Sequence, residues 1–284
     1  MYTENIYQSD YHIEHEFSYL GETGSKTDTR AEKKRTPEEI RRANNAHRAK
    51  VLRRTIQLNF RPGDLLITLK YPRGERPGIE KLKEHFAKFR RVMKKQYQKQ
   101  GKEMKYIYRF EIGKMGGVHA HVIMNRIDGA LEIMTKAWQK ARGVTAIEDM
   151  VAADSAELPE LVTLDGKVDL RLLYMDGGYR ELADYLCKAL PGEIEGTLTK
   201  EEKKEFYAYG SSRNLKRPEP IRKKYAHWTM KRILEAGPEK INTDPALQKR
   251  YLHPGFMIDK STWETGVNPV TGKSFLYYTE VRAT

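Results

Sequence analysis

Two histidines separated by a single residue, His119 and His121, are the strongest candidates for chemistry in this chain. They lie in an apolar, β-forming segment that follows the glycine-rich residues 113–117. Because side chains alternate along a β-strand, both imidazoles are predicted to share one face, and Val118 and Val122 the buried face. Neighbouring imidazoles on a rigid strand suit a divalent metal ion, although surface or core histidines at this spacing are also common.

A glutamate on the preceding segment is predicted to complete the metal site. Residues 105–112 are rich in β-forming residues, and the simplest hairpin register pairs Glu111 with His119. Glu111 would then lie on the face that carries both histidines. Two nitrogens and one oxygen with open positions favour Mg²⁺ or Mn²⁺ acting on a phosphodiester over a closed structural zinc site. An ion pair of Glu111 with Arg109 or a nearby lysine is the alternative.

Tyr185 is the candidate nucleophile. Apolar residues recur at helical spacing through residues 181–190, and Pro191-Gly192 is expected to end this helix. Tyr185 and Lys188 are three residues apart, so they are predicted to share one helix face. A nearby cation favours the phenolate and stabilises charge on a phosphorane transition state. An ordinary amphipathic tyrosine beside a solvated lysine is the alternative.

In this order, the candidate residues resemble the motifs of the HUH endonucleases. They are most similar to the single-tyrosine rolling-circle replication initiators (Rep) of Gram-positive plasmids, phages and integrated elements. The resemblance runs from about residue 33 to residue 225. Four segments carry it: Asp64–Tyr71, Val118–Asn125, Tyr185–Lys188 and Ser211–Pro218. Lys70 departs from the pattern, because many relatives have a small polar residue there.

The resemblance implies a site-specific single-stranded DNA endonuclease and strand transferase that starts rolling-circle replication. Glu111, His119 and His121 would hold Mg²⁺ or Mn²⁺, and Tyr185 would attack the scissile phosphate with help from Lys188. The products would be a 5′-phosphotyrosine and a free 3′-hydroxyl. The implied partners are single-stranded or hairpin origin DNA, a host helicase and a host DNA polymerase.

Other functions are compatible with the same residues. A relaxase or transposase of the same superfamily would use this chemistry on a different DNA element. A non-catalytic basic DNA-binding regulator would show no Mn²⁺-dependent nicking, and an RNA-binding protein would need none of the motifs. Tyr179 is the nearest further tyrosine for a second strand transfer, but it is predicted to face away from Tyr185.

The composition agrees with a nucleic-acid partner. The 284 residues can bury a full core, and a formal net charge of +13 predicts a polyanionic partner. A single cysteine excludes a disulfide framework and cysteine-rich zinc modules. Because neither a signal peptide nor an apolar run of membrane length is present, the chain is expected to be cytoplasmic, without a membrane partner.

Strands alternate with helices around the candidate residues. Strands are predicted at residues 65–71 and 168–175, with core-facing helices over residues 79–93 and 131–138. This order predicts an α+β fold. The resemblance further implies a central antiparallel β-sheet flanked by helices (the HUH endonuclease fold), with the histidines on a middle strand and the tyrosine helix beside it.

Four parts are predicted along the chain. They are a mobile N-terminal arm (1–30), a basic helical lead-in (31–58), an HUH endonuclease domain (59–225) and a C-terminal appendage with a helix and a β-hairpin (226–284). The His12-x-x-His15 spacing in the arm lacks the His-Glu-x-x-His order of a zinc protease helix, so both histidines are expected to be solvated. Residues 266–274 resemble a phosphate-binding loop, but its first glycine would fall on Val267 and a strand follows, so a hairpin is predicted instead.

Two basic segments are candidates for DNA contacts. Residues 30–54 contain ten Lys and Arg against three Asp and Glu, which predicts a helix along phosphates or a merely solvated charged helix. The predicted backbone contacts on this helix are Arg41, Arg42, Arg48, Arg53 and Arg54. Beyond the tyrosine helix, Lys216 and Arg217 are further phosphate candidates. Arg213 and Asn214 are expected to reach bases near the nick, with a structural turn as the alternative.

Overall fold

The chain folds into two compact units, which we call the central unit (residues 44–216) and the terminal unit (residues 1–43 with 217–284). The computed structural model describes residues 2–19, 36–72, 74–113, 116–143, 162–164, 168–174, 176–188, 196, 198–207, 209–225, 227–267 and 274–283. Within these ranges, no helix combines the length and the apolar character that crossing a lipid bilayer requires.

The central unit is built on a six-stranded sheet in which all neighbouring strands are antiparallel. The strands are β3 (Leu65–Leu69), β4 (Tyr106–Ile112), β5 (Val118–Met124), β6 (Val162–Leu164), β7 (Val168–Leu172) and β8 (Tyr209–Ser211). Their order across the sheet is β6-β7-β3-β5-β4-β8, so the histidine strand β5 is one of the two middle strands. The predicted α+β class is therefore confirmed, although the chain contains a second sheet that was not predicted.

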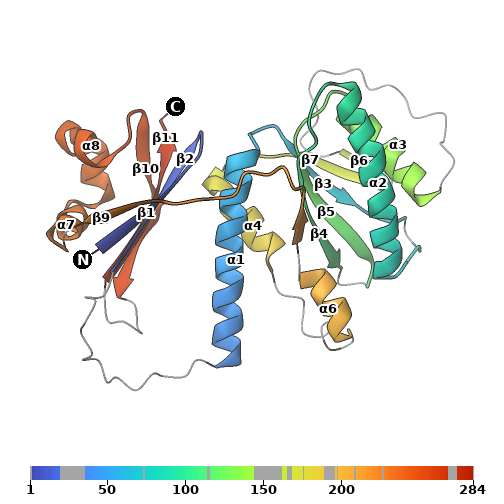
Figure 1. The fold of residues 1–284 in the computed structure, drawn as a ribbon, viewed down its shortest axis with the longest axis horizontal. Helices are drawn as coiled ribbons and strands as arrows, with labels where there is room; N and C mark the ends of the chain where they lie inside the picture. Colours follow the sequence, from blue (N-terminus) through green and yellow to red (C-terminus); the bar gives the residue numbers. More distant parts are fainter. Residues whose placement is uncertain are drawn as a thin grey trace. The chain divides into compact units, whose positions relative to one another are not determined.

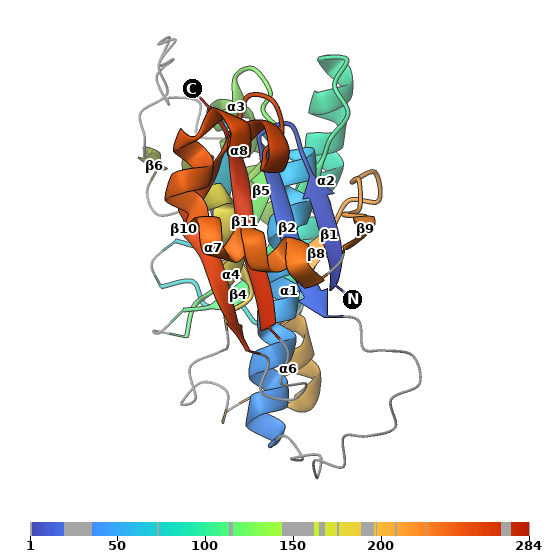
Figure 2. The ribbon, with the colours of Figure 1, turned by 90° about the vertical axis from the view of Figure 1, so that its left-hand side faces the viewer.

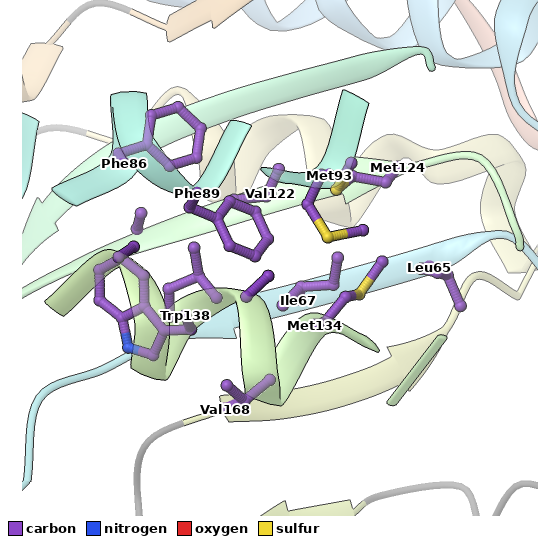
Figure 3. Packing of buried hydrophobic residues seen from close by; sticks show 14 of the residues in the cluster. Leu65, Ile67, Phe86, Phe89, Met93, Val122, Met124, Met134, Trp138 and Val168 are labelled. Carbon is purple, nitrogen blue, oxygen red and sulfur yellow. The ribbon is translucent and has the colours of Figure 1, made fainter. Parts of the chain in front are cut away.

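One face of this sheet is apolar and is covered by α2 (Ile79–Lys99) and α3 (Ala130–Arg142), as Figure 1 shows. The core between the two layers contains Phe89, Trp138 and Ile67, each with no exposed surface (Figure 3). Alternation along β3 and β5 points every second side chain into this core. The remaining side chains of these strands are thereby directed to the opposite face.

The opposite face packs against α1 (Pro37–Asn59) and α4 (Arg180–Leu186), which follows the short 3₁₀ helix η1 (Asp176–Tyr179). Ile123 of β5 and Leu52 of α1 belong to this second apolar cluster. A further helix, α6 (Lys200–Tyr207), precedes the edge strand β8. Because α4 lies on this face, the sheet positions the histidines and the tyrosine helix on the same side.

The terminal unit contains a five-stranded sheet whose strands come from both ends of the chain. The strands are β1 (Tyr2–Gln8), β2 (His12–Tyr19), β9 (Ile221–Tyr225), β10 (Phe256–Val267) and β11 (Ser274–Arg282). Their order is β10-β11-β2-β1-β9, so β2 lies at the centre. Figure 2 shows α7 (His227–Thr243) and α8 (Pro245–Tyr251) against one face of this sheet.

The prediction of a mobile arm at residues 1–30 is wrong for residues 2–19, which form β1 and β2. The N-terminal and C-terminal parts also belong to one unit, not to two separate appendages. The error arose because polar residues occupy buried positions, which breaks the apolar alternation that normally reveals a strand. His12 and His15 are such residues, with exposed fractions of 2% and 3%, so the prediction that they are solvated is also wrong. Residues 20–30 lie outside the described residues.

The segment that resembles a phosphate-binding loop belongs to a pair of antiparallel strands. The register of β10 and β11 begins with Val267 opposite Ser274. The predicted turn residues 268–273 lie outside the described ranges. A strand follows this segment where a phosphate-binding loop requires a helix.

Candidate active site

The hairpin of β4 and β5 carries the three candidate metal ligands. Its register pairs Glu111 with His119 and Arg109 with His121, so the predicted pairing of Glu111 is confirmed. Residues directly opposite each other on antiparallel strands project to the same face of the sheet. The three candidate ligands and Arg109 therefore share the face on which α4 packs.

The candidate ligand atoms converge on one point. The Nε2 atoms of His119 and His121 are 3.1 Å apart. Glu111 Oε2 lies 2.8 Å from Nε2 of His121 and 3.7 Å from Nε2 of His119. Atoms that are each about 2.1 Å from one ion, at right angles, are about 3.0 Å apart. The spacing therefore fits one divalent ion with coordination positions left over for phosphate oxygens.

Thr68 of β3, a residue not singled out in the sequence, contacts one of these histidines. It lies directly opposite His121 in the sheet, and its Oγ1 is 3.2 Å from Nδ1 of His121. If Nδ1 donates its proton to Thr68, the lone pair of Nε2 is free for a metal ion. The sequence placed Thr68 in a predicted strand but could not pair that strand with β5.

Tyr185 lies near the end of α4 with its hydroxyl directed at the ligand atoms. The hydroxyl is 2.9 Å from Glu111 Oε2 and 2.9 Å from His121 Nε2. The residue is 41% exposed, so a phosphate from solvent can reach the hydroxyl. The fold thus brings the tyrosine within hydrogen-bond distance of a glutamate that is 74 residues earlier in the chain.

The electrostatics of the site keep Tyr185 protonated. Burial and the neighbouring Glu111 carboxylate raise the pKa of Tyr185 above its ordinary value. Burial also acts to raise the pKa of Glu111, but hydrogen bonds from His119, His121 and Tyr185 hold that pKa well below its usual range. The expectation that Lys188 makes the phenolate the resting form is therefore wrong. Positive charge that arrives with a metal ion is needed to activate this phenol.

Burial lowers the pKa of His121, which favours the neutral imidazole. A histidine must be neutral to bind a metal ion, because protonation removes the lone pair. The nearly buried position of His121, at 8% exposure, therefore prepares it for a cation rather than for a proton.

Arg109 holds the end of the tyrosine helix and was considered in the sequence only as a partner for Glu111. It is 3% exposed, and its guanidinium donates to the carbonyl oxygens of Leu186 and Lys188, both at 2.6 Å. A weaker contact at 3.3 Å reaches the carbonyl oxygen of Tyr185. The last carbonyls of a helix lack partners within the helix and carry partial negative charge, which a cation stabilises. Arg109 therefore fixes the end of α4 to the hairpin.

The helix α4 ends at Leu186, so Lys188 lies beyond it and not on its face as predicted. The ammonium group of Lys188 is nevertheless 5.9 Å from the centroid of the Tyr185 ring. The predicted proximity is thus present, but the chain beyond the helix end provides it. Pro191-Gly192, which was predicted to end the helix, lies outside the described residues.

Comparison with known families agrees with this geometry. Residues 64–160 match the family of the replication-associated protein ORF2. This segment resembles a replication-associated protein. The match supports a role in the initiation of replication, and the matched segment contains Glu111, His119 and His121 but ends before Tyr185. No curated protein and no solved structure matches the chain.

The matched segment also contains Arg109, and we predict that this residue positions the nucleophile. Arg109→Lys keeps the charge but loses the planar set of donors that holds two carbonyl oxygens. We expect the rate of DNA nicking at saturating DNA to fall about 10- to 100-fold, because small displacements of a reacting group cost that much. DNA affinity should change less than about threefold, and circular dichroism should show a folded protein at the assay temperature.

Arg90→Lys is the matched control for this prediction. Arg90 lies on α2 and donates to the hydroxyl of Tyr106 at 2.8 Å, on the face of the sheet away from the site. Its replacement should leave the nicking rate within about twofold of the original. A nicking rate of Arg109→Lys equal to that of Arg90→Lys would contradict the positioning role.

The arginines predicted to contact phosphates along α1 differ in exposure. Arg41 and Arg42 are exposed, and Arg48 and Arg53 are partly buried. Arg54 is only 5% exposed, so its predicted contact with DNA is wrong for the folded chain. Residues 54–57 are all buried, because packing encloses this end of the helix on most sides. Charge in the sequence does not distinguish a buried arginine from a solvated one.

The segment after β8 forms a structural turn. The side chain of Asn214 donates to the carbonyl oxygen of Met104 at 3.1 Å. The backbone N–H of Lys216 donates to Asn59 Oδ1 at 2.8 Å, and Asn59 in turn donates to the Lys216 carbonyl oxygen. Asn214 is therefore held by the protein, which agrees with the structural alternative.

This turn lies at the far end of β4 from the candidate site. Met104 precedes Glu111 by seven residues, which corresponds to about 23 Å along an extended strand. Arg213 is exposed, but its position beside this end of β4 argues against a contact with bases next to Tyr185. Lys216 and Arg217 are exposed and remain predicted phosphate contacts.

Tyr179, the other tyrosine considered for strand transfer, is not available to DNA. It is 3% exposed and packs in the apolar cluster with Leu52 and Leu186. Its φ of 65° lies in the left-handed region, which costs energy for a residue other than glycine. Tyr179 therefore shapes the turn into α4, and it does not contribute a second nucleophile in this fold.

Proposed function

We propose that this protein is a metal-dependent, tyrosine-based enzyme that nicks and rejoins single-stranded DNA at a replication origin and thereby initiates rolling-circle replication. The observation that carries the proposal is the Tyr185 hydroxyl, which lies 2.9 Å from both Glu111 Oε2 and His121 Nε2. A nucleophile and a set of metal ligands thus share one exposed site. The match to replication-associated proteins supports the biological role.

Glu111, His119 and His121 would hold the divalent ion. Their two imidazole nitrogens and one carboxylate oxygen suit Mn²⁺, and the open positions also allow Mg²⁺ with bound water. When bound there, the ion would polarise the scissile phosphate and neutralise part of its charge. Thr68 supports this arrangement, because its contact with Nδ1 of His121 directs Nε2 towards the ion.

The proposed reaction is a transesterification at phosphorus. The Oη atom of Tyr185 attacks the phosphorus, the Oη–P bond forms, and the bond from phosphorus to the 3′ oxygen breaks. The phenolic proton leaves through an acceptor within 2.9 Å, either Glu111 Oε2 or His121 Nε2. A proton ends on the 3′ oxygen, so the products are a 5′-phosphotyrosine and a 3′-hydroxyl. The ester preserves the energy of the phosphodiester, so rejoining needs no ATP.

Two cations stand near the phenol to bind the substrate. Lys188 is exposed beside the tyrosine ring, and Arg171 of β7 is also exposed. The charge of Arg171 acts to lower the pKa of Tyr185, against the larger effects of burial and Glu111. A phosphate between these cations would have its negative charge partly neutralised before attack.

The experiment that tests the function is a search for a covalent DNA adduct. In-line attack requires a phosphate on a freely positioned strand, which a stacked duplex does not provide. With Mn²⁺ and single-stranded or hairpin DNA from its own replicon, the protein should form an adduct that survives denaturing electrophoresis. Relaxed duplex of the same sequence should react at least about 100-fold more slowly.

The outcomes of this experiment separate the candidate functions. Equal cleavage of relaxed duplex and single strand would contradict the strand requirement. Tight DNA binding with no adduct under any divalent ion would favour a non-catalytic DNA-binding regulator. Adduct formation on the ends of a mobile element, but not on a replication origin, would favour a relaxase or transposase.

A further inference from the structure

A second group of titratable side chains lies in the terminal unit, on the buried face of its sheet. His15 belongs to the central strand β2, Glu4 to β1 and Glu280 to β11. In the strand registers both glutamates are diagonal neighbours of His15, so the three side chains share one face. Their exposed fractions are 3%, 4% and 0%. His253, which follows α8, reaches the same point from outside the sheet.

These side chains are in close contact. His15 Nδ1 lies 2.5 Å from Glu4 Oε1, and His15 Nε2 lies 2.9 Å from Glu280 Oε1. The other oxygen of Glu280 is 3.0 Å from Nδ1 of His253. Candidate ligand atoms of His15, His253 and Glu280 all lie within 4.8 Å of one another. The group therefore has the compactness of a metal site.

Two atoms at the centre of this group lack hydrogen bonds. His15 Nε2 and Glu280 Oε1 are close together but outside hydrogen-bond geometry, and neither has another such partner among the described residues. Buried polar atoms almost always have partners, so this pair needs an explanation. Two ligands of one ion are about 3 Å apart without pointing at each other, which is the geometry of this pair.

Glu4 provides the outer partner that metal-binding histidines usually have. A histidine that ligates a metal generally donates its other ring N–H to a carboxylate or carbonyl. The contact of Glu4 with Nδ1 of His15 places the proton there and leaves the lone pair of Nε2 for a cation. The ring of His15 is further fixed by stacking on Tyr278, with centroids 4.5 Å apart.

We propose that His15, His253 and Glu280 form a second metal site, which binds a divalent transition-metal ion of the Zn²⁺ type. Two imidazoles and one carboxylate are a zinc donor set, whereas Mg²⁺ and Ca²⁺ prefer oxygen ligands. The side chain of His253 is 33% exposed, so solvent can supply a fourth ligand. The ion would tie the second strand of the chain to its last strand and would stabilise the terminal unit.

A proton is the alternative occupant of this position. Burial alone would lower the pKa of His15, but Glu280 and Glu4 together raise it above its ordinary value. A protonated His15 would balance the two carboxylates without any ion. Metal titration distinguishes these occupants, because only the metal site gains stability from added Zn²⁺.

The experiment measures zinc binding in the full chain with the first site removed. In the His119→Ala/His121→Ala background, equilibrium dialysis should find one Zn²⁺ per chain. Saturating Zn²⁺ should raise the melting temperature by at least about 5 °C. Adding His253→Ala should remove both the bound ion and the shift in melting temperature. The control His47→Ala removes an exposed histidine of α1 and should change neither.

Cobalt provides a second measurement if His253→Ala is poorly folded. Co²⁺ in this background should show the visible absorption of a low-coordinate site, and His253→Gln should lose it while preserving a polar side chain. Zinc bound equally in the presence and absence of His253 would overturn the proposal. So would the failure of the His119→Ala/His121→Ala background to bind Zn²⁺ or Co²⁺. Neither result bears on DNA nicking, so the two proposals fail independently.

Discussion

Tyr185→Phe should abolish the covalent DNA adduct and reduce nicking at least about 10⁴-fold, the scale of effect seen when a nucleophile is removed. The substitution deletes only the hydroxyl that lies 2.9 Å from Glu111 and from His121. The aromatic ring and its edge-on contact with His121, with centroids 5.2 Å apart, are preserved. Affinity for single-stranded DNA should therefore stay within about threefold of the original value, as a filter-binding or anisotropy titration would show.

Tyr174→Phe is the matched control for the nucleophile. Tyr174 is 52% exposed and lies between β7 and η1, so a labelled phosphate could reach it as easily as Tyr185. Its replacement should leave nicking unchanged. Mass spectrometry of the adduct should place the nucleotide on Tyr185, and a nucleotide on Tyr174 or Tyr179 would show that the wrong tyrosine has been assigned.

The second large effect is expected from the metal ligands. His119→Ala/His121→Ala should lose nicking in both Mn²⁺ and Mg²⁺, because the remaining carboxylate cannot hold the ion at the site. EDTA should stop the unaltered protein in the same way, while much of the DNA binding persists. Nicking by the double variant at the original rate would exclude a role for these histidines in catalysis.

Thr68→Val gives a graded test of the same site. The variant is close in shape but loses the hydroxyl that contacts Nδ1 of His121. Loss of such an outer contact typically weakens metal binding 10- to 100-fold. We therefore expect the Mn²⁺ concentration for half-maximal nicking to rise by about that factor, with a nearly normal rate at saturating Mn²⁺. A lower rate that excess Mn²⁺ does not restore would contradict this explanation.

The terminal unit shows why some of the fold could not be predicted. Its strands β1 and β2 carry Glu4 and His15 at positions that are buried in the folded chain. Sequence patterns recognise a half-buried strand by apolar residues at alternate positions, and these two residues interrupt the pattern. Their burial becomes possible only when β11, from the other end of the chain, supplies Glu280 as a partner. No local pattern contains that information.

The limits of local pattern also explain the errors at the DNA-binding residues. Arg54 and Asn214 were assigned to DNA because of charge and hydrogen-bonding capacity, which are properties of the residue alone. Packing buries Arg54, and the Met104 carbonyl oxygen binds the Asn214 side chain. Lys188 was expected on a helix face, but α4 ends two residues earlier. Where a helix ends depends on tertiary contacts such as those of Arg109 with the last carbonyl oxygens.

The sequence by itself determined the hairpin at the centre of the candidate site. Strand alternation and a short turn are local properties, so they were sufficient to place Glu111 opposite His119 and to put His121 on the same face. Only the tertiary structure decided that α4 packs on that face, that Tyr185 reaches Glu111 across 74 residues, and that Thr68 supports His121. Those contacts depend on which strands pair and which faces are buried, and the whole chain determines these by burying its apolar surface.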